Sequence, residues 1–171
     1  MKHQPRQRKV SGAQFLSEHC FVCGVNNSMS LQARFFNLAD GDICALFTAK
    51  KEHQGYPGRA HGGIISAILD ETIARAIQVK YPEIFGVTIE LNVKFRKPVP
   101  IGEELKVLAR LDTHNKRVFE GTGEVLLADG TVAAQASAIF LHMETDTLVN
   151  GKFDDSYLIV DEGPIPQIIE I

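Results

Sequence analysis

The fold of this chain is decided by residues 61–71, which read HGGIISAILDE. Two glycines open the stretch, and the apolar residues after them recur every three to four positions, the spacing of one face of an α-helix. A glycine-rich loop, 53–61, leads into it. Pro82 ends it, because proline disfavours helical backbone in the residue before it. We therefore expect one helix from Gly62 to about Lys80.

The faces of this helix differ in polarity. A projection at 100° per residue predicts a solvent-facing stripe of Glu71, Arg75 and Gln78, and a broad core face made of Ile65, Ile68, Leu69, Thr72, Ile73, Ala76 and Val79. Asp70 belongs to neither stripe, and its neighbours on the helix are small or apolar. It is either a functional acid or a helix-border aspartate held by solvent or by the Ser66 hydroxyl.

Strands are expected on both sides of the helix, because apolar and polar residues alternate there. The longest alternation runs over 87–96, and the turn at 39–42 predicts a hairpin. The remaining alternating segments are 31–35, 43–49, 105–111, 118–127 and 132–140. The pattern indicates an α+β domain over 31–142, in which a long antiparallel sheet surrounds one helix.

The two ends differ from this middle part. Residues 1–30 are expected to form an N-terminal segment with a short helix or loop, and residues 143–171 an acidic C-terminal tail. Apolar patches within the tail are candidates for an edge strand or for a contact with a partner.

Composition excludes several classes of protein. The chain has 171 residues, 44% of them apolar and 23% charged, as is typical of one soluble globular domain. A net charge of −3 argues against a nucleic-acid partner. No apolar run approaches the ~18 residues of a membrane span, so no membrane partner is expected. Three cysteines and no apolar signal segment favour the cytoplasm.

The spacing of His61, Gly62, Gly63 and Asp70 resembles the HGG-x(6)-D signature of the PaaI-like and 4-hydroxybenzoyl-CoA-type acyl-CoA thioesterases. The segment CFVCG at 20–24 is similar to the start of that group. The resemblance covers about 20–142. It implies the hot-dog fold, which assembles as a dimer or a dimer of dimers.

The resemblance also implies a site. Asp70 corresponds to the nucleophile or general base, the Gly62 amide to the oxyanion hole, and Thr88 to the residue that orients the attacking group. His61, which begins the motif, is expected to belong to the same catalytic group. Many members of the superfamily carry Asn or Gln at the position of Gly55. Here Gln54 and His53 precede that position, so either is a candidate to assist the nucleophile, and both are expected to contact the substrate.

Spacing adds a constraint on the assembly. Asp70 lies eight residues beyond Gly62, or ~12 Å along an α-helix. The two residues can act on one thioester only if they come from different protomers, which predicts a homodimer or homotetramer with shared sites. Gly63 has no Cβ to obstruct a thioester and is expected to contact the substrate.

The expected substrate is an acyl-CoA, and because coenzyme A is part of it, no separate cofactor is expected. Arg96, Lys97 and Arg117 are candidates to bind its phosphates. A hydratase or dehydratase acting through His53 on enoyl or 3-hydroxyacyl thioesters, and a non-catalytic acyl-CoA binding or sensing protein, remain alternatives.

Two cysteines in the N-terminal segment, Cys20 and Cys23, invite comparison with a metal site. A structural zinc site needs four ligands, and no second CxxC follows. No metal is therefore expected, and the pair is predicted to pack a loop.

Overall fold

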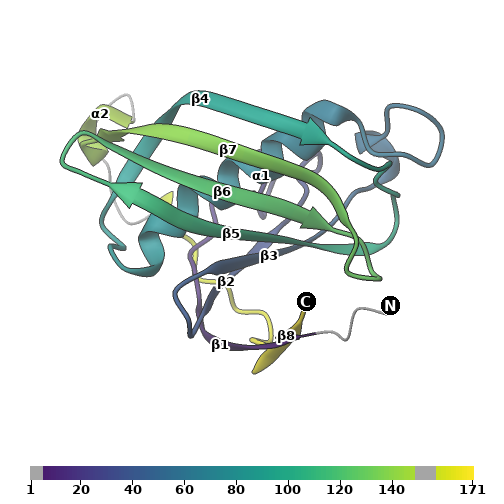
Figure 1. Cartoon of the computed structure of the whole chain (residues 1–171), viewed down its shortest axis with the longest axis horizontal. Helices are drawn as coiled ribbons and strands as arrows, with labels where there is room; N and C mark the ends of the chain where they lie inside the picture. Colours follow the sequence, from purple (N-terminus) through teal and green to yellow (C-terminus); the bar gives the residue numbers. More distant parts are fainter. Residues whose placement is uncertain (1–5, 149–156) are drawn as a thin grey trace.

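A computed structural model describes residues 6–148 and 157–171 and contains one eight-stranded antiparallel sheet (Figure 1). The strand order is β4-β7-β6-β5-β3-β2-β1-β8. The elements are β1 (Gln7–Ala13), β2 (Arg34–Leu38), β3 (Ile43–Thr48), a 3-10 turn η1 (Lys51–His53), α1 (Gly62–Ala76), a 3-10 turn η2 (Ile77–Val79), β4 (Phe85–Phe95), β5 (Glu104–His114), β6 (Val118–Leu126), β7 (Val132–Met143), α2 (Thr145–Leu148) and β8 (Ile168–Glu170).

The long strands β4 to β7 wrap around α1, which lies behind them in Figure 1. Leu105, Val107 and Ala109 alternate along β5 and are buried on the side of the helix. The predicted core face of α1 is buried from Ile65 to Ala76. This is the hot-dog fold, and its prediction from the sequence is confirmed.

Two glycines of β6 let the helix approach the sheet closely. A Cβ on Gly121 would lie 2.8 Å from Ile73 Cγ2, and one on Gly123 would lie 2.9 Å from Ile73 Cγ1. Real Cβ atoms do not pack this closely, so any larger residue here would push α1 away from the sheet. These glycines therefore fix the depth at which the helix, and with it Asp70, sits.

The N-terminal segment differs from the prediction of a short helix or loop, because residues 7–13 form strand β1. It pairs with β2 on one side and with β8 on the other, so its backbone hydrogen bonds are made within the sheet. A second, smaller core forms there from Phe36, Leu38, Cys44 and Ile169. The edge strand expected in the tail is thus present as β8, whereas the domain boundaries at 30 and 142 remain predictions. The part of the tail at 149–156 lies outside the described residues.

The expected solvent-facing stripe of α1 is not solvent-facing. Residues 14–24, here called the N-terminal strap, cover Glu71 and Arg75, whereas Gln78 donates to the Ile84 carbonyl at 3.2 Å. Arg75 is paired with Glu71 at 2.8 Å, and its Nη1 also donates to the Phe15 carbonyl at 2.8 Å. Only 13% of the Arg75 side chain is exposed. The stripe is polar because it binds the strap, whose backbone groups need partners.

Within the described residues, no helix combines the length and the apolar character that a bilayer span requires.

Candidate active site

The first turn of α1 presents one backbone amide to its surroundings. His61 is the N-cap, and its Nδ1 accepts a hydrogen bond from the Gly63 amide at 2.9 Å. The His61 ring and the Gly63 amide therefore form the helix cap, and the roles predicted for His61 in catalysis and for Gly63 in substrate binding stay predictions. Within the part of the chain that the structure describes, no acceptor faces the exposed Gly62 amide. The helix dipole favours negative charge at this amide, as an oxyanion hole requires.

The anomalous carboxylate of the helix has a specific partner. Thr88 Oγ1 of β4 donates a hydrogen bond of 2.8 Å to Asp70 Oδ1. A β-bulge follows directly after Thr88, a feature that re-aims side chains at functional sites. Ser66 does not hold Asp70, since its hydroxyl donates to the Gly62 carbonyl at 3.0 Å. The structure thus brings together Thr88 and Asp70, two residues that the family resemblance singles out, while their roles in catalysis stay predictions.

Burial raises the pKa of the Asp70 carboxyl above its ordinary value. The hydrogen bond from Thr88 acts in the opposite direction and lowers this pKa, whereas the charge of the adjacent Glu71 raises it. A carboxylate whose pKa is raised by burial and which has a hydroxyl orienting it is suited to accept a proton or attack a carbonyl.

Gly62 and Asp70 belong to one uninterrupted helix, so the eight-residue spacing holds in the structure. At ~1.5 Å per residue the amide and the carboxylate are ~12 Å apart along the axis. Within one protomer the Gly62 amide and the Asp70 carboxylate are therefore too far apart to contact the same carbonyl group.

The loop histidine expected to help the chemistry is structural. His53 is 2% exposed, its Nδ1 accepts from the Lys50 amide at 2.9 Å, and its Nε2 faces the Met29 carbonyl at 2.8 Å. Both ring nitrogens face backbone groups, so neither is free to bind a substrate in this arrangement. The side chain of Gln54 accepts from the Gly58 amide at 3.3 Å and closes the loop.

The three candidate cations do not share one place. Arg96 and Lys97 follow β4 and donate their backbone amides to the Ala133 carbonyl. Arg117 lies in the turn between β5 and β6. Phe95 pairs with Ala134 and Val118 with Leu141, seven residues apart on β7, or ~23 Å. Arg117 is therefore at the opposite end of the sheet within one chain.

A residue that the sequence does not single out lies beside Gly62. A Cβ on Gly62 would be 3.5 Å from the Phe95 ring, and this ring is 56% exposed. Phe95 ends β4 next to Arg96 and Lys97, so the aromatic ring, the two cations and the Gly62 amide occupy one end of the molecule. The alternation along β4 gives no sign of this, because the proximity depends on how β4 crosses α1.

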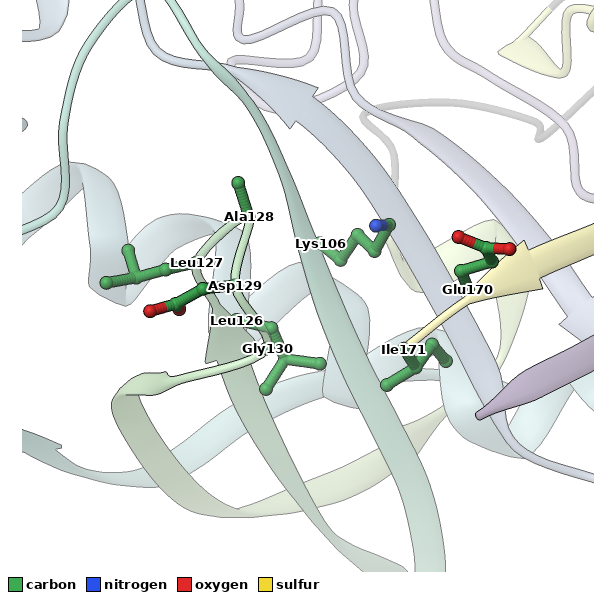
Figure 2. Close-up of a pocket in the computed structure, with 8 residues that line it drawn as sticks. All are labelled: Lys106, Leu126, Leu127, Ala128, Asp129, Gly130, Glu170 and Ile171. Atoms are coloured by element: carbon green, nitrogen blue, oxygen red, sulfur yellow. The ribbon is translucent and has the colours of Figure 1, made fainter. Parts of the chain in front are cut away.

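The pocket drawn in Figure 2 lies elsewhere. It is lined by Lys106 of β5, by the turn 126–130, and by Glu170 and Ile171 at the end of the chain. Lys106 alternates with the buried residues of β5 and so belongs to the sheet face away from α1. None of the candidate site residues lines this pocket.

Residues 57–134, which contain this site from the loop to the start of β7, match the sequence model of the thioesterase superfamily. This region is a thioesterase-superfamily domain. Asp70, Thr88 and Gly62 lie inside the matched range, whereas His53 and Gln54 precede it.

Individual relatives agree with this assignment. Acyl-coenzyme A thioesterase THEM4 of Rattus norvegicus is 30% identical over 115 residues, which are 67% of this chain and 49% of that protein. The chain thus spans about half the length of the curated relatives it matches.

Solved structures share the fold of this chain. The thioesterase superfamily protein RHA08564 has a TM-score of 0.64 and 28% identity, covering 72% of this chain and 63% of that one. The smu.793 protein of Streptococcus mutans UA159, solved bound to acetyl CoA, has a TM-score of 0.55 and 18% identity, covering 61% of this chain and 82% of that one.

Proposed function

We propose that this chain is an acyl-CoA thioesterase that hydrolyses its substrate to a free acid and coenzyme A. The observation that carries the proposal is the Asp70–Thr88 hydrogen bond on a helix whose first amide, that of Gly62, is available to an oxyanion. The relative named an acyl-coenzyme A thioesterase supports the reaction class.

The proposed chemistry follows from these groups. The thioester carbonyl oxygen accepts a hydrogen bond from the Gly62 amide, which stabilises the negative charge that develops during attack. In one route Asp70 takes a proton from water, whose oxygen attacks the carbonyl carbon. In the other route the carboxylate itself attacks, and water then hydrolyses the mixed anhydride. In both routes the C–S bond breaks and coenzyme A leaves as a thiolate. In the first route the thiolate takes up the proton that Asp70 removed from water, and in the second it takes up the proton released when water hydrolyses the anhydride.

The site is proposed to be completed by a second protomer. β4 is an edge strand of the sheet, and it exposes Val87, Ile89 and Phe95 at 39%, 58% and 56%. A long apolar edge strand is a template for pairing with another chain. Antiparallel pairing of two β4 strands would bring the Phe95 end of one protomer, which carries Gly62, towards the Thr88 region of its partner. Dimer and dimer of dimers both satisfy this arrangement.

Arg96 and Lys97 are the proposed contacts for the phosphates of coenzyme A, because they lie at the Gly62 end of the sheet. The acetyl CoA in the S. mutans protein supports a coenzyme A ligand for this fold. Arg117 contributes to the same ligand only from another protomer.

The two alternatives are less well supported. A hydratase acting through His53 requires a free imidazole nitrogen, and both nitrogens of His53 face backbone groups. A binding or sensing protein has no need for a half-buried carboxylate with a raised pKa, whose ionised form costs free energy in the folded state.

The decisive experiment is free-thiol release from short aliphatic, long aliphatic and aromatic acyl-CoAs. Wild type is compared with Asp70→Asn, and Asp112→Asn serves as the matched control, because Asp112 is exposed on β5 and makes only a surface pair with Arg110. We expect turnover in wild type and in the control, and its loss in Asp70→Asn. Saturable acyl-CoA binding without thiol release in wild type would instead identify a binding protein.

A further inference from the structure

A second cluster of reactive side chains, separate from Asp70 and Thr88, lies where the N-terminal strap crosses α1. The Sγ atoms of Cys20 and Cys23 and a carboxylate oxygen of Glu71 all lie within 4.8 Å of one another. Arg75 Nη2 is 3.3 Å from Cys23 Sγ, while its Nε donates to Glu71 at 2.8 Å. The proposed hydrolysis uses none of these groups.

The backbone of the strap holds the two thiols together. The Gly24 amide donates to the Cys20 carbonyl at 2.8 Å, so residues 20–24 form one helical turn. Side chains three residues apart in such a turn lie on the same side. A Cβ on Gly24 would be only 2.3 Å from the Cys20 carbonyl oxygen, so this tight turn requires glycine. This turn leaves the Sγ atoms of Cys20 and Cys23 within 4.8 Å of each other.

The two thiols differ in reactivity. Cys23 is 1% exposed, whereas Cys20 is only half-buried. Hydrogen bonds from the Cys23 thiol and from the Val22 amide, the latter at 3.3 Å, lower the pKa of Cys20, although burial and Glu71 oppose this effect. Thiolate character and access together define the attacking thiol of a dithiol pair. Cys20 has both properties.

This cluster is poorly suited to bind a metal ion. Among the described residues it offers three ligand groups, whereas structural zinc sites use four. One of the three, Glu71, is already paired with Arg75. The guanidinium also lies against Cys23 Sγ and places a positive charge where the cation would bind.

We propose that Cys20 and Cys23 form a redox-active dithiol, which closes to a disulfide by exchange with a small-molecule disulfide. The Cys20 thiolate attacks one sulfur of that disulfide, forms a mixed disulfide and releases one thiolate. Cys23 then loses its proton and attacks Cys20 Sγ, which releases the second thiol. Two protein thiols are oxidised and the small disulfide is reduced to two thiols.

The test counts thiols and maps the bond in the folded full-length protein. Reduced protein is incubated with glutathione disulfide, free thiols are titrated, and digested protein is examined by mass spectrometry. We expect two of the three thiols to be lost and Cys20 to be found linked to Cys23. Dithiothreitol should restore both thiols. Cys44→Ala is the matched control, because Cys44 is fully buried in the core and its loss should leave the exchange intact.

Two single variants separate the roles of the cysteines. Cys23→Ser should stop at the mixed disulfide, so the protein gains one glutathione on Cys20. Cys20→Ser should react far more slowly, because the remaining thiol is buried. Retention of all three thiols in wild type would overturn the proposal. Incubation with zinc alone provides the other contrary outcome: a tightly bound stoichiometric ion that blocks disulfide formation would show a metal site instead.

Discussion

Thr88 Oγ1 and Asp70 Oδ1 are joined by a hydrogen bond of 2.8 Å between the edge strand β4 and the central helix α1. This contact fixes one oxygen of a half-buried carboxylate and opposes the effect of burial on its pKa. The hydroxyl therefore sets both the orientation of Asp70 and the pH range in which it is ionised.

Removal of the Thr88 hydroxyl should shift the pH profile of hydrolysis. In Thr88→Val the pKa of Asp70 loses the hydrogen bond that lowers it, so the pKa rises further and the carboxylate is protonated at a higher pH. We expect the acid limb of the pH profile of kcat/KM to move to higher pH, so that the rate falls most at low pH. Thr88→Ser keeps the hydroxyl and should keep the wild-type limb. An unchanged limb in Thr88→Val would show that Thr88 does not act on the ionisation of Asp70.

The negative charge of Asp70 should also lower the stability of the folded protein at neutral pH. Its pKa is raised in the folded state, so the stability linked to its protonation is present at low pH and is lost as pH rises through the folded pKa. Asp70→Asn carries no charge at any pH and still accepts a hydrogen bond from Thr88. At pH 7 its Tm should exceed that of wild type, and the difference should shrink towards about pH 4, where the carboxyl of wild type is protonated.

Thermal denaturation across this pH range measures the effect, with Asp112→Asn as the exposed control. A lower Tm for Asp70→Asn at pH 7 would mean that Asp70 stabilises the fold and that its raised pKa has another origin.

The sheet was predictable because each of its long strands buries one face. Alternation in 87–96 and in the segments after it identifies β4 to β7 directly. Strand β1 escapes this reasoning, since Val10 is its sole large apolar residue and the strand is stabilised by backbone pairing with β2 and β8. Pairing between segments distant in the sequence leaves no periodic signal in either of them.

Only those features of the candidate site that lie within one stretch of the sequence were predictable. The spacing from Gly62 to Asp70 follows from the helix, and the meeting with Thr88 was implied by a family resemblance. The burial of individual polar side chains was not predictable. His53 therefore resembled an exposed loop histidine, and the stripe that contains Arg75 resembled a solvent-facing side of the helix. Both are covered by the strap or by residues beside it, and a polarity pattern cannot show what packs against a polar face.

The Gly62 amide can be removed almost without disturbing the helix. Proline is favoured at the first helical position, and His61, with φ −66° and ψ 143°, already has the extended backbone that a following proline requires. Gly62→Pro should therefore fold, yet lower kcat by about 10²–10³, the usual effect of losing one oxyanion donor. Gly62→Ala keeps the amide, and its Cβ would meet Phe95 at an ordinary 3.5 Å. It should retain most of the activity. Equal losses in the two variants would point to crowding rather than to a lost donor.

A shared site makes these variants complementary. If Gly62 of one protomer acts with Asp70 of the other, a mixed dimer of Gly62→Pro and Asp70→Asn chains has one intact site and one site lacking both groups. Random pairing of differently tagged chains in one cell would give about one quarter of the wild-type sites, because half of the dimers are mixed and each contains one intact site of two. Each variant alone should stay at its own low rate, about 10²-fold or more below wild type. Tandem purification of the mixed dimer, followed by the thiol-release assay, measures the recovery. A mixed dimer as inactive as its parents would place both groups of each site in a single chain, in conflict with the ~12 Å that separates them on α1.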